Sequence, residues 1–336
     1  MMVDWLTVEC PADLPGPITG GVVSKVTNEG EVEWCVHQRM QLEGSWSSSI
    51  MVRSVSPQLL EISGNVAKFM QGHNIYGPAD VYALIAAFLE RVGPVLWPDG
   101  MPSVAIGDGQ ISRIDVTSGL LLERPADVLS FIKAADERGV CSHRGRGVFK
   151  GEGTLVYGDA TGKRAKAWQV TLYSKGLEVA RRPLPGPMME FPGVLDWVNR
   201  LLRVEVRLRT AELKRLGLRT VGEWSPETVD RVWREKVGRI EFMEGSVMDC
   251  SDMEGVKPRL LDAYDAWVAG RDLRQGRPKA SFYRLRREMK QVFGVDIALV
   301  APRSNVVPLR RVIIAEPVHR PPWADTVDFL LASRAA

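Results

Sequence analysis

The sequence lacks the marks of a membrane-spanning, secreted or zinc-binding protein. Its four cysteines are scattered without CxxC spacing, so neither a zinc site nor a disulfide framework is indicated. No apolar run approaches the ~20 residues that a membrane helix needs. The first ten residues carry an acid, Asp4, where a signal peptide would carry basic residues, and they have the pattern of a first strand. We therefore expect the protein to stay in a cytoplasm.

Histidine is equally scarce. The four histidines form no HExxH or similar pair, so a metal cage built from histidine is not expected. Any metal would depend on carboxylates, which favour hard ions such as Mg²⁺ or Mn²⁺. Internal repeats and low-complexity segments are lacking too.

What is present is an ordinary globular composition with an uneven distribution of charge. With 336 residues, 45% of them apolar and 25% charged, the chain can form one large domain or two. The net charge is only +3, yet residues 271–290 hold eight basic side chains against two acidic ones, and residues 203–215 hold five against two. Such clusters suit a polyanion, although solvated helix faces give the same pattern.

The order of elements predicts an α+β fold. Residues 1–64 have the pattern of strands and turns, and the helices expected at 78–93 and 124–139 each have proline within their first two residues and glycine at the end. Beyond residue 220, amphipathic helices are expected over residues 226–242, 258–270 and 279–293. We predict a first domain over 1–220, built on an antiparallel central sheet with helices on one face. A smaller, basic, mainly helical accessory region over 221–336 would contact DNA.

Three strands share one alternation of polar and apolar residues. The polar positions are Arg113, Asp115 and Thr117 in SRIDVT, Gln169, Thr171, Tyr173 and Lys175 in QVTLYSK, and Arg203, Glu205, Arg207 and Arg209 in RVEVRLR. If these strands pair in one sheet, the polar residues share one face and the helices cover the other.

That polar face has a chemical interpretation. Asp115 and Glu205, on neighbouring strands, can hold one Mg²⁺ or Mn²⁺ and leave coordination sites for substrate oxygens. Such a metal polarises a phosphodiester. The Tyr173 hydroxyl is an oxygen nucleophile, and the Lys175 ammonium would favour its phenolate form. The predicted reaction is a transesterification that leaves a phosphotyrosine.

Arginines would complete such a site by clamping phosphates. The candidates on the polar face are Arg113, Arg203 and Arg207. A simpler interpretation is a solvated strand face in which Glu205 and its neighbouring arginines form a cross-strand ladder of ion pairs. The residues alone leave both interpretations open.

Five motifs, taken together, resemble a known family. They are KFMQGHNIYGPADV, ISRIDVT, TLYSKGLEV, LLRVEVRLRTAELKRLGL and NVVPLRRVIIAEPVHRPPW, and they occur in the family's order over nearly the whole chain. The sequence resembles the replication initiators of filamentous bacteriophages, the gene II protein family.

This resemblance implies a rolling-circle initiator in the cytoplasm of a bacterial host. Such a protein nicks one strand at the double-stranded origin, stays linked to the 5′ end through tyrosine, and later rejoins the ends. The host replicative helicase and polymerase are implied partners. By the resemblance, Tyr173 is the nucleophile, and Asp115 and Glu205 are the best metal ligands.

Two further residues of these motifs keep alternative roles. His73 could supply one metal ligand, or its ring could satisfy backbone groups in a turn. Glu178 could be a third carboxylate ligand or a general base. It could equally be a residue at a helix start, stabilised by the helix dipole.

Other functions remain to be weighed. A non-catalytic protein that binds the origin or single-stranded DNA would explain the basic clusters but not two carboxylates on a DNA-facing surface. Tyrosine recombinases also form phosphotyrosine, but their catalytic domains are mostly helical. Tyr157 is the second candidate nucleophile. The first candidate for a contact with duplex DNA is the helix KASFYRLRREMKQ, with Arg284, Arg286 and Arg287.

Overall fold

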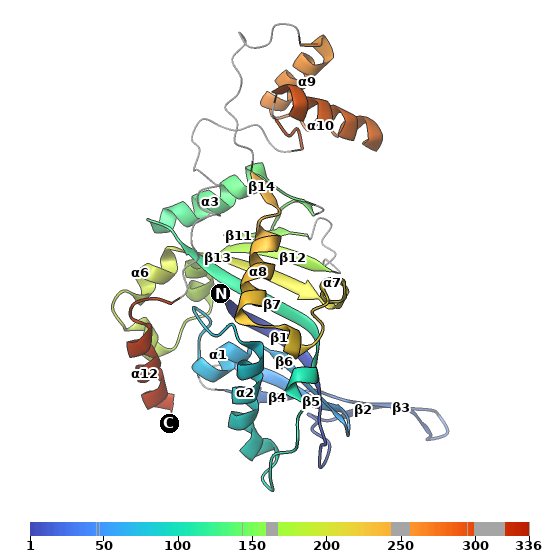
Figure 1. Ribbon diagram of the computed structural model, residues 1–336, viewed down its shortest axis with the longest axis vertical. Coiled ribbons are helices and arrows are strands. Elements are labelled where there is room, and N and C mark those ends of the chain that lie inside the picture. Colours follow the sequence, from blue (N-terminus) through green and yellow to red (C-terminus); the bar gives the residue numbers. More distant parts are fainter. Residues whose placement is uncertain are drawn as a thin grey trace.

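A nine-stranded antiparallel sheet forms the centre of the protein (Figure 1). The computed structural model describes residues 1–44, 46, 48–142, 144–158, 167–242, 256–293, 295–298 and 320–335. In spatial order the strands are β10 (Val148–Phe149), β11 (Thr154–Tyr157), β12 (Trp168–Ser174), β13 (Leu201–Arg209), β7 (Gln110–Leu121), β1 (Met2–Pro11), β6 (Leu59–Gly64), β5 (Ser49–Ser56) and β4 (Met40–Glu43). The expected α+β class and its antiparallel central sheet are confirmed.

Three helices cover the apolar face of this sheet: α2 (Val81–Leu96), α3 (Pro125–Arg138) and α8 (Pro226–Val237). Their buried side chains share one hydrophobic core with alternate residues of the central strands. In Figure 1, α8 crosses in front of β13 and β7. Proline at the start of α3 and α8 suits the first helical turn, where a backbone N–H has no intrahelical partner. These three core helices lie on one face, as expected.

Shorter elements join these layers. The helices are α1 (Val66–Gln71), α4 (Lys175–Arg181), α5 (Gly186–Met189), α6 (Val194–Asn199) and α7 (Thr210–Leu216), with single turns η1 (Ile106–Asp108) and η2 (Val221–Glu223). A three-stranded sheet of β14 (Ile240–Phe242), β8 (Gly139–Cys141) and β9 (Gly145–Arg146) lies next to α3 (Figure 1).

The main core extends beyond the boundary expected near residue 220. Trp233 of α8 donates its indole N–H to the carbonyl of Val204 at 3.0 Å, which ties this helix to the centre of the sheet. After α8, the chain pairs β14 with β8, so the body includes residues up to 242. The helix expected over 226–242 therefore ends at Val237, and the last residues of that segment form a strand.

The rest of the chain does not form one accessory unit. Helices α9 (Pro258–Val268) and α10 (Lys279–Phe293) share a second core, in which Tyr264 and Trp267 pack with Phe293 and which Val140 of β8 also joins. This helical module, residues 256–298, lies beyond the β8–β14 end of the body (Figure 1). Helix α12 (Ala324–Ala335) instead packs beside α5 and α6.

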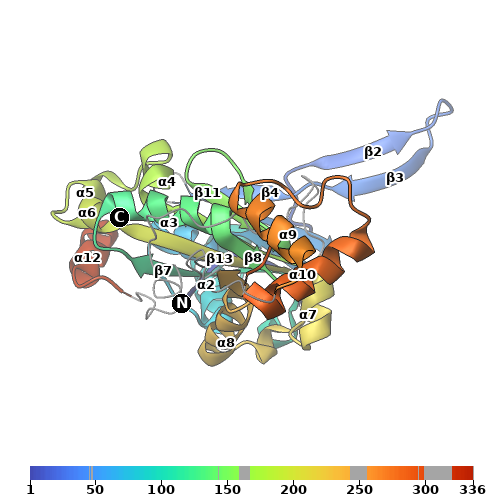
Figure 2. The same ribbon diagram turned by 90° about the horizontal axis from the view of Figure 1, so that it is seen from above.

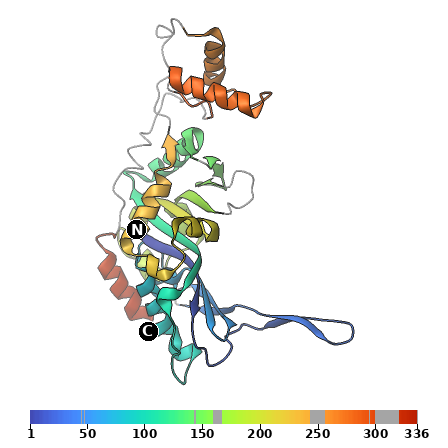
Figure 3. The same ribbon diagram turned by 45° about the vertical axis from the view of Figure 1, so that its right-hand side comes forward.

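A two-stranded arm, β2 (Val22–Val26) and β3 (Val32–His37), projects from the other end of the body (Figures 2 and 3). None of the helices that the structure describes is long and apolar enough to cross a membrane. The hairpin tip ATGKRAK and most of the motif NVVPLRRVIIAEPVHRPPW lie outside the described residues.

Candidate active site on the polar face of the sheet

The three strands with matching alternation are direct neighbours in the order β12, β13, β7. Glu205 lies opposite Thr171 on one side and Thr117 on the other, and Arg207 lies opposite Asp115. Tyr173 lies opposite Arg203. Because side chains alternate along strands, these residues share the face that the core helices leave uncovered. The sheet thus brings Asp115, Glu205 and Tyr173 together, as the sequence predicted.

Two arginines hold the carboxylate of Asp115, which is only 2% exposed. Arg113 donates from Nε and Nη2 at 2.9 and 2.5 Å, and Arg207 donates from Nε at 3.1 and 3.0 Å to the two oxygens. The Arg113 guanidinium also lies over the Trp5 ring, 4.5 Å from its centroid. Charge-assisted bonds from two directions fix the position of this carboxylate.

The Glu205 carboxylate is contacted by Arg207, one of these two arginines. Its Oε1 accepts from Arg207 Nη2 at 2.9 Å. Burial, followed by the charges of Asp115 and Asp4, raises the pKa of Glu205 to about 8. Crowded carboxylates disfavour each other's ionised form, and a bound cation would relieve that repulsion.

Tyr173 is the second-last residue of β12 and is half-buried. Burial raises its pKa well above the usual value, and Glu178, Asp4 and Glu205 raise it further, while Arg203 acts in the opposite sense. The phenol therefore stands among three carboxyl groups. Tyr157, the second candidate nucleophile, lies on the apolar face instead, where its buried hydroxyl donates to the carbonyl of Ala135 at 2.8 Å.

The position of Lys175 differs from the expectation. Strand β12 ends at Ser174, whose hydroxyl accepts from the backbone N–H of Leu177 at 3.3 Å and so caps α4. Lys175 is consequently the first residue of a helix and does not continue the polar strand face. Its ammonium is buried, and it donates at 2.7 Å to both Glu178 Oε2 and Asn74 Oδ1. Burial lowers the pKa of Lys175.

Glu178 lies in the first turn of α4, as one of its alternative roles required. Burial would raise its pKa, but the charge and hydrogen bond of Lys175, together with the charges of Arg203 and Lys68, lower it. A carboxyl group with a lowered pKa is a weaker proton acceptor. The geometry therefore favours a positioning role for Glu178. Its negative charge is stabilised by the positive end of the α4 dipole and by Lys175.

The sequence patterns did not identify two residues of this site, Asp4 and Asn74. Asn74 donates to Asp4 Oδ1 at 2.9 Å and accepts from Lys175, so it links β1 to α4. Simple alternation groups Asp4 with Leu6 and Val8 on the apolar face. A register shift between Val3 and Trp5 interrupts that alternation and lets Asp4 reach the polar cluster.

His73 lies beside this cluster, but its ring contacts a different element. The ring is fully buried, and Nε2 is 3.7 Å from Asp328 of α12. Nδ1 is 3.4 Å from the backbone N–H of Ile75 and 3.3 Å from the Gln71 amide. Burial lowers the pKa of His73, against the opposing effect of Asp328. This arrangement matches the turn role considered for His73 better than a metal ligand.

Arg203 requires a correction. A phosphate clamp needs an accessible guanidinium, but Arg203 is 1% exposed. Its Nη1 donates to the carbonyl of Ile75 at 2.6 Å, and its Nη2 donates to the carbonyl of Asn74. Arg203 therefore fixes the loop that presents Asn74, whereas Arg113 and Arg207 remain partly accessible.

The three arginines of α10 lie in the helical module and not on the polar face. Arg284 and Arg287 are exposed. Arg286 is half-buried and forms a two-pronged ion pair with Asp296, with both N–O distances at 2.5 Å. Of the three, Arg284 and Arg287 are the ones whose charge is directed to solvent.

The donor set fits a magnesium-like ion. Within the described residues, no group of three or more histidine, cysteine, aspartate or glutamate side chains is arranged to hold a metal. Mg²⁺, however, is commonly bound by one or two carboxylates together with substrate phosphates and water. Asp115 and Glu205, two positions apart on paired strands, provide such a partial set.

Comparisons with known proteins identify the family of the chain. The family model for the N-terminal part of the gene II replication-associated protein matches residues 2–227. The chain is 33% identical, over 344 aligned residues, to the gene II replication-associated protein of Enterobacteria phage I2-2, with 98% of each chain covered. No solved structure matches the chain. The chain belongs to the gene II family of replication-associated proteins of filamentous phages.

Proposed function

We propose that this phage replication protein initiates rolling-circle replication by nicking one strand at the double-stranded origin and later rejoining it. The supporting observation is the common location of Tyr173, Asp115 and Glu205 on the face of the sheet opposite the core helices. A nucleophilic oxygen beside carboxylates suited to Mg²⁺ or Mn²⁺ is the donor set of phosphodiester transfer.

The reaction is a balanced exchange of phosphate esters. The Tyr173 oxygen attacks the phosphorus, the bond from phosphorus to the 3′ oxygen breaks, and the tyrosine proton is released as the leaving oxygen gains one. The products are a 5′-phosphotyrosine and a 3′-hydroxyl. Rejoining reverses these steps, with a 3′-hydroxyl as the nucleophile.

The residues of the chain divide the work of this reaction. Burial and neighbouring carboxylates raise the pKa of Glu205 to about 8, and a bound cation would lower it again, so Glu205 would act as an ionised metal ligand beside Asp115. Arg113 and Arg207 contact the scissile phosphate from one side. Lys175, Glu178 and Asn74 hold the end of β12 and so position Tyr173.

A bound Mg²⁺ or Mn²⁺, held by Asp115 and Glu205, would polarise the phosphodiester and favour the phenolate. Asp115 would exchange part of its contact with Arg113 or Arg207 for the ion, which would free an arginine for phosphate. Arg284 and Arg287 on α10 would contact the origin duplex. The host polymerase would extend the 3′-hydroxyl, and a host helicase would open the duplex.

The test is incubation of the protein with supercoiled DNA carrying its own phage origin, with Mg²⁺ or with EDTA, followed by denaturing gels. We expect a nicked, protein-linked product that requires the metal. Tyr173→Phe, which removes only the hydroxyl, should abolish the linkage while origin binding persists. The adduct should be on the 5′ phosphate, whereas a tyrosine recombinase would attach to the 3′ phosphate.

Tyr157→Phe is the matched control, because it removes a hydroxyl from the opposite face. This variant should still form the adduct, with a loss of about 1 kcal/mol in stability from the missing hydrogen bond. An adduct that survives in Tyr173→Phe would assign another nucleophile. Intact binding without a nick under any metal would instead indicate a non-catalytic origin-binding or single-strand-binding protein.

A further inference from the structure

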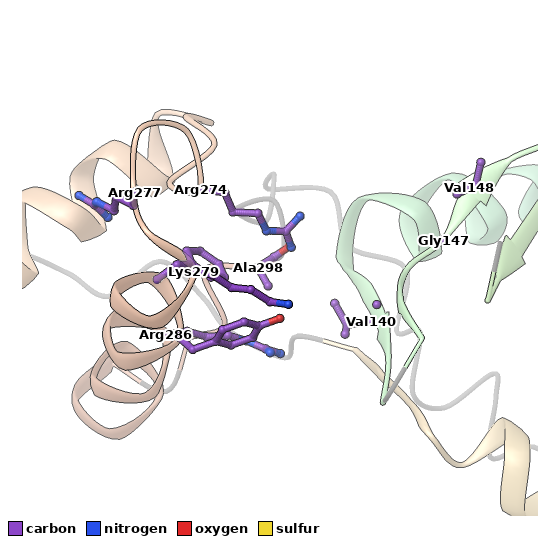
Figure 4. A pocket seen from close by; sticks show the side chains of 11 residues that line it. Val140, Gly147, Val148, Arg274, Arg277, Lys279, Arg286 and Ala298 are labelled. Carbon is purple, nitrogen blue, oxygen red and sulfur yellow. The ribbon is translucent and has the colours of Figure 1, made fainter. Parts of the chain in front are cut away.

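A basic cleft separates the helical module from the body. One hollow of 590 Å³ lies between α10 and the segment that contains β8, β9 and β10, and a second hollow of 690 Å³ adjoins it. Figure 4 shows the side chains of Arg274 and Lys279 directed from the module into the gap, with Val140 and Gly147 on the opposite wall.

One face of α10 lines this cleft. Lys279, Tyr283, Arg286 and Lys290 are spaced by four, three and four residues, so they lie on one side of the helix. All four line one or both hollows. The adjacent side of α10 buries Phe282, Met289 and Phe293 in the core that it shares with α9, and Phe282 also borders the first hollow. The amphipathic pattern of the helix therefore presents a cationic stripe, and not an apolar one, to the cleft.

The charge of the cleft is strongly positive. The cationic residues that line it are Arg274, Arg277, Lys279, Arg286, Arg287 and Lys290, against Glu241. Asp296 neutralises part of this charge, because it pairs with Arg286 at 2.5 Å and with Lys290 at 3.0 Å. Arg274 is held at the rim by the ring of Phe282, 5.4 Å away, and by the carbonyl of Ala298 at 3.3 Å.

An aromatic ring stands within this cationic lining. Tyr283 is half exposed, although it lies on a well-formed helix and its neighbour Phe282 is buried. Its ring contacts Phe282 edge-to-face at 5.7 Å, which holds it in place. A cationic groove with an accessible aromatic ring is the arrangement that binds single-stranded nucleic acid, with phosphates on the cations and a base on the ring.

We propose that this cleft binds single-stranded DNA, with phosphates on Arg274 and Lys279 and a base stacked on Tyr283. Stacking on the exposed Tyr283 ring requires a base whose face is free, and the bases of a double helix are already stacked on one another, so the occupant is a single strand. This inference rests on the proposed function in one respect, the choice of DNA as the ligand, because nicking at an origin leads to a displaced single strand.

The experiment measures binding of a fluorescent 20-nucleotide single strand without origin sequence, by anisotropy, at several salt concentrations. Full-length protein carrying Tyr173→Phe is used, so that no covalent product forms. Lys279→Glu should weaken binding about tenfold or more and reduce the slope of log affinity against log salt by about 0.7, the value for one phosphate contact. Tyr283→Ala should weaken binding about 5- to 100-fold, and Tyr283→Phe should retain it.

Lys257→Glu is the matched control, because it makes the same charge change at an exposed position before α9 that does not line the cleft. Equal losses in Lys257→Glu and Lys279→Glu would overturn the proposal, because the overall field of the module would then explain the binding. A 20-base-pair duplex weakened as strongly as the single strand by Lys279→Glu would overturn it as well, as would unchanged single-strand affinity.

The proposed cleft and the proposed nicking function are tested by independent measurements. Loss of single-strand affinity in Lys279→Glu supports the cleft whether or not the protein nicks DNA. A covalent adduct that depends on Tyr173 supports the nicking function whether or not the cleft binds a strand.

Discussion

Arg207 and Asp115 lie directly opposite each other on β13 and β7, and the Arg207 guanidinium donates to both oxygens of the Asp115 carboxylate. The same guanidinium reaches Glu205 on its own strand at 2.9 Å. One arginine therefore connects the two carboxylates proposed to hold a metal. This connection keeps like charges together on one face of the sheet before any ion or DNA is bound.

The first prediction concerns the charge of Asp115. Asp115→Asn keeps the volume but leaves Arg113 and Arg207 without their shared anion, so we expect a loss of about 1–3 kcal/mol in the free energy of unfolding. Urea unfolding followed by circular dichroism measures this loss. The variant should also lose metal-dependent nicking.

The control for that experiment is Asp230→Asn. Asp230 pairs with Arg234 on the exposed side of α8, where an ion pair contributes no more than about 0.5 kcal/mol. If both variants unfold at the urea concentration of the wild type, the network around Asp115 does not stabilise the fold.

The second prediction concerns pH in metal-free buffer. The pKa of Glu205 is raised to about 8, so the folded protein retains a proton there that the unfolded chain has released above its ordinary pKa. The contribution of Glu205 to the free energy of unfolding should therefore fall as pH rises from about 5 to 8. Glu205→Gln removes this dependence and should be more stable than the wild type at pH 8, by at least about 1 kcal/mol.

Added Mg²⁺ should reverse the order of stability of the wild type and Glu205→Gln. At pH 8, added Mg²⁺ should stabilise the wild type, because an ion bound to the folded state shifts the unfolding equilibrium, and it should leave Glu205→Gln nearly unchanged. Glu90→Gln, at an exposed position of α2, serves as the control. Identical pH profiles for the wild type and Glu205→Gln would contradict the assignment of this titration.

The third prediction concerns the attachment of α12. The Tyr76 hydroxyl donates to Asp328 at 2.6 Å and lies 3.3 Å from the carbonyl of Ala324, while its ring packs edge-to-face against His73 at 4.5 Å. Tyr76→Phe removes a hydrogen bond to a charged acceptor and should cost about 1.5–3 kcal/mol. Thermal unfolding measures the effect.

Tyr82→Phe, which alters an exposed hydroxyl on α2, should change stability by less than about 0.5 kcal/mol. Limited proteolysis of Tyr76→Phe should cut near α12 sooner than in the wild type. Equal protection of both variants would mean that the hydrogen bond to Asp328 does not hold this helix.

Much of the fold was available from the sequence, because alternation and helical periodicity depend on neighbouring residues only. Strict alternation in RVEVRLR and SRIDVT placed Glu205 and Asp115 on one face, and the sheet pairs those strands as expected. Proline and glycine likewise marked α3 near its observed ends. The motifs indicated the family that the comparisons establish.

The tertiary structure decided which polar residues form the site. Lys175 does not lie on the polar strand face, because Ser174 caps a helix there. The Arg203 side chain is buried, because its guanidinium donates to the carbonyls of Asn74 and Ile75. Asp4 joined the cluster through a register shift that no local pattern encodes. The sequence by itself determined periodicity and residue chemistry, whereas burial and long-range hydrogen bonds, which depend on residues distant in the chain, determined the role of each side chain.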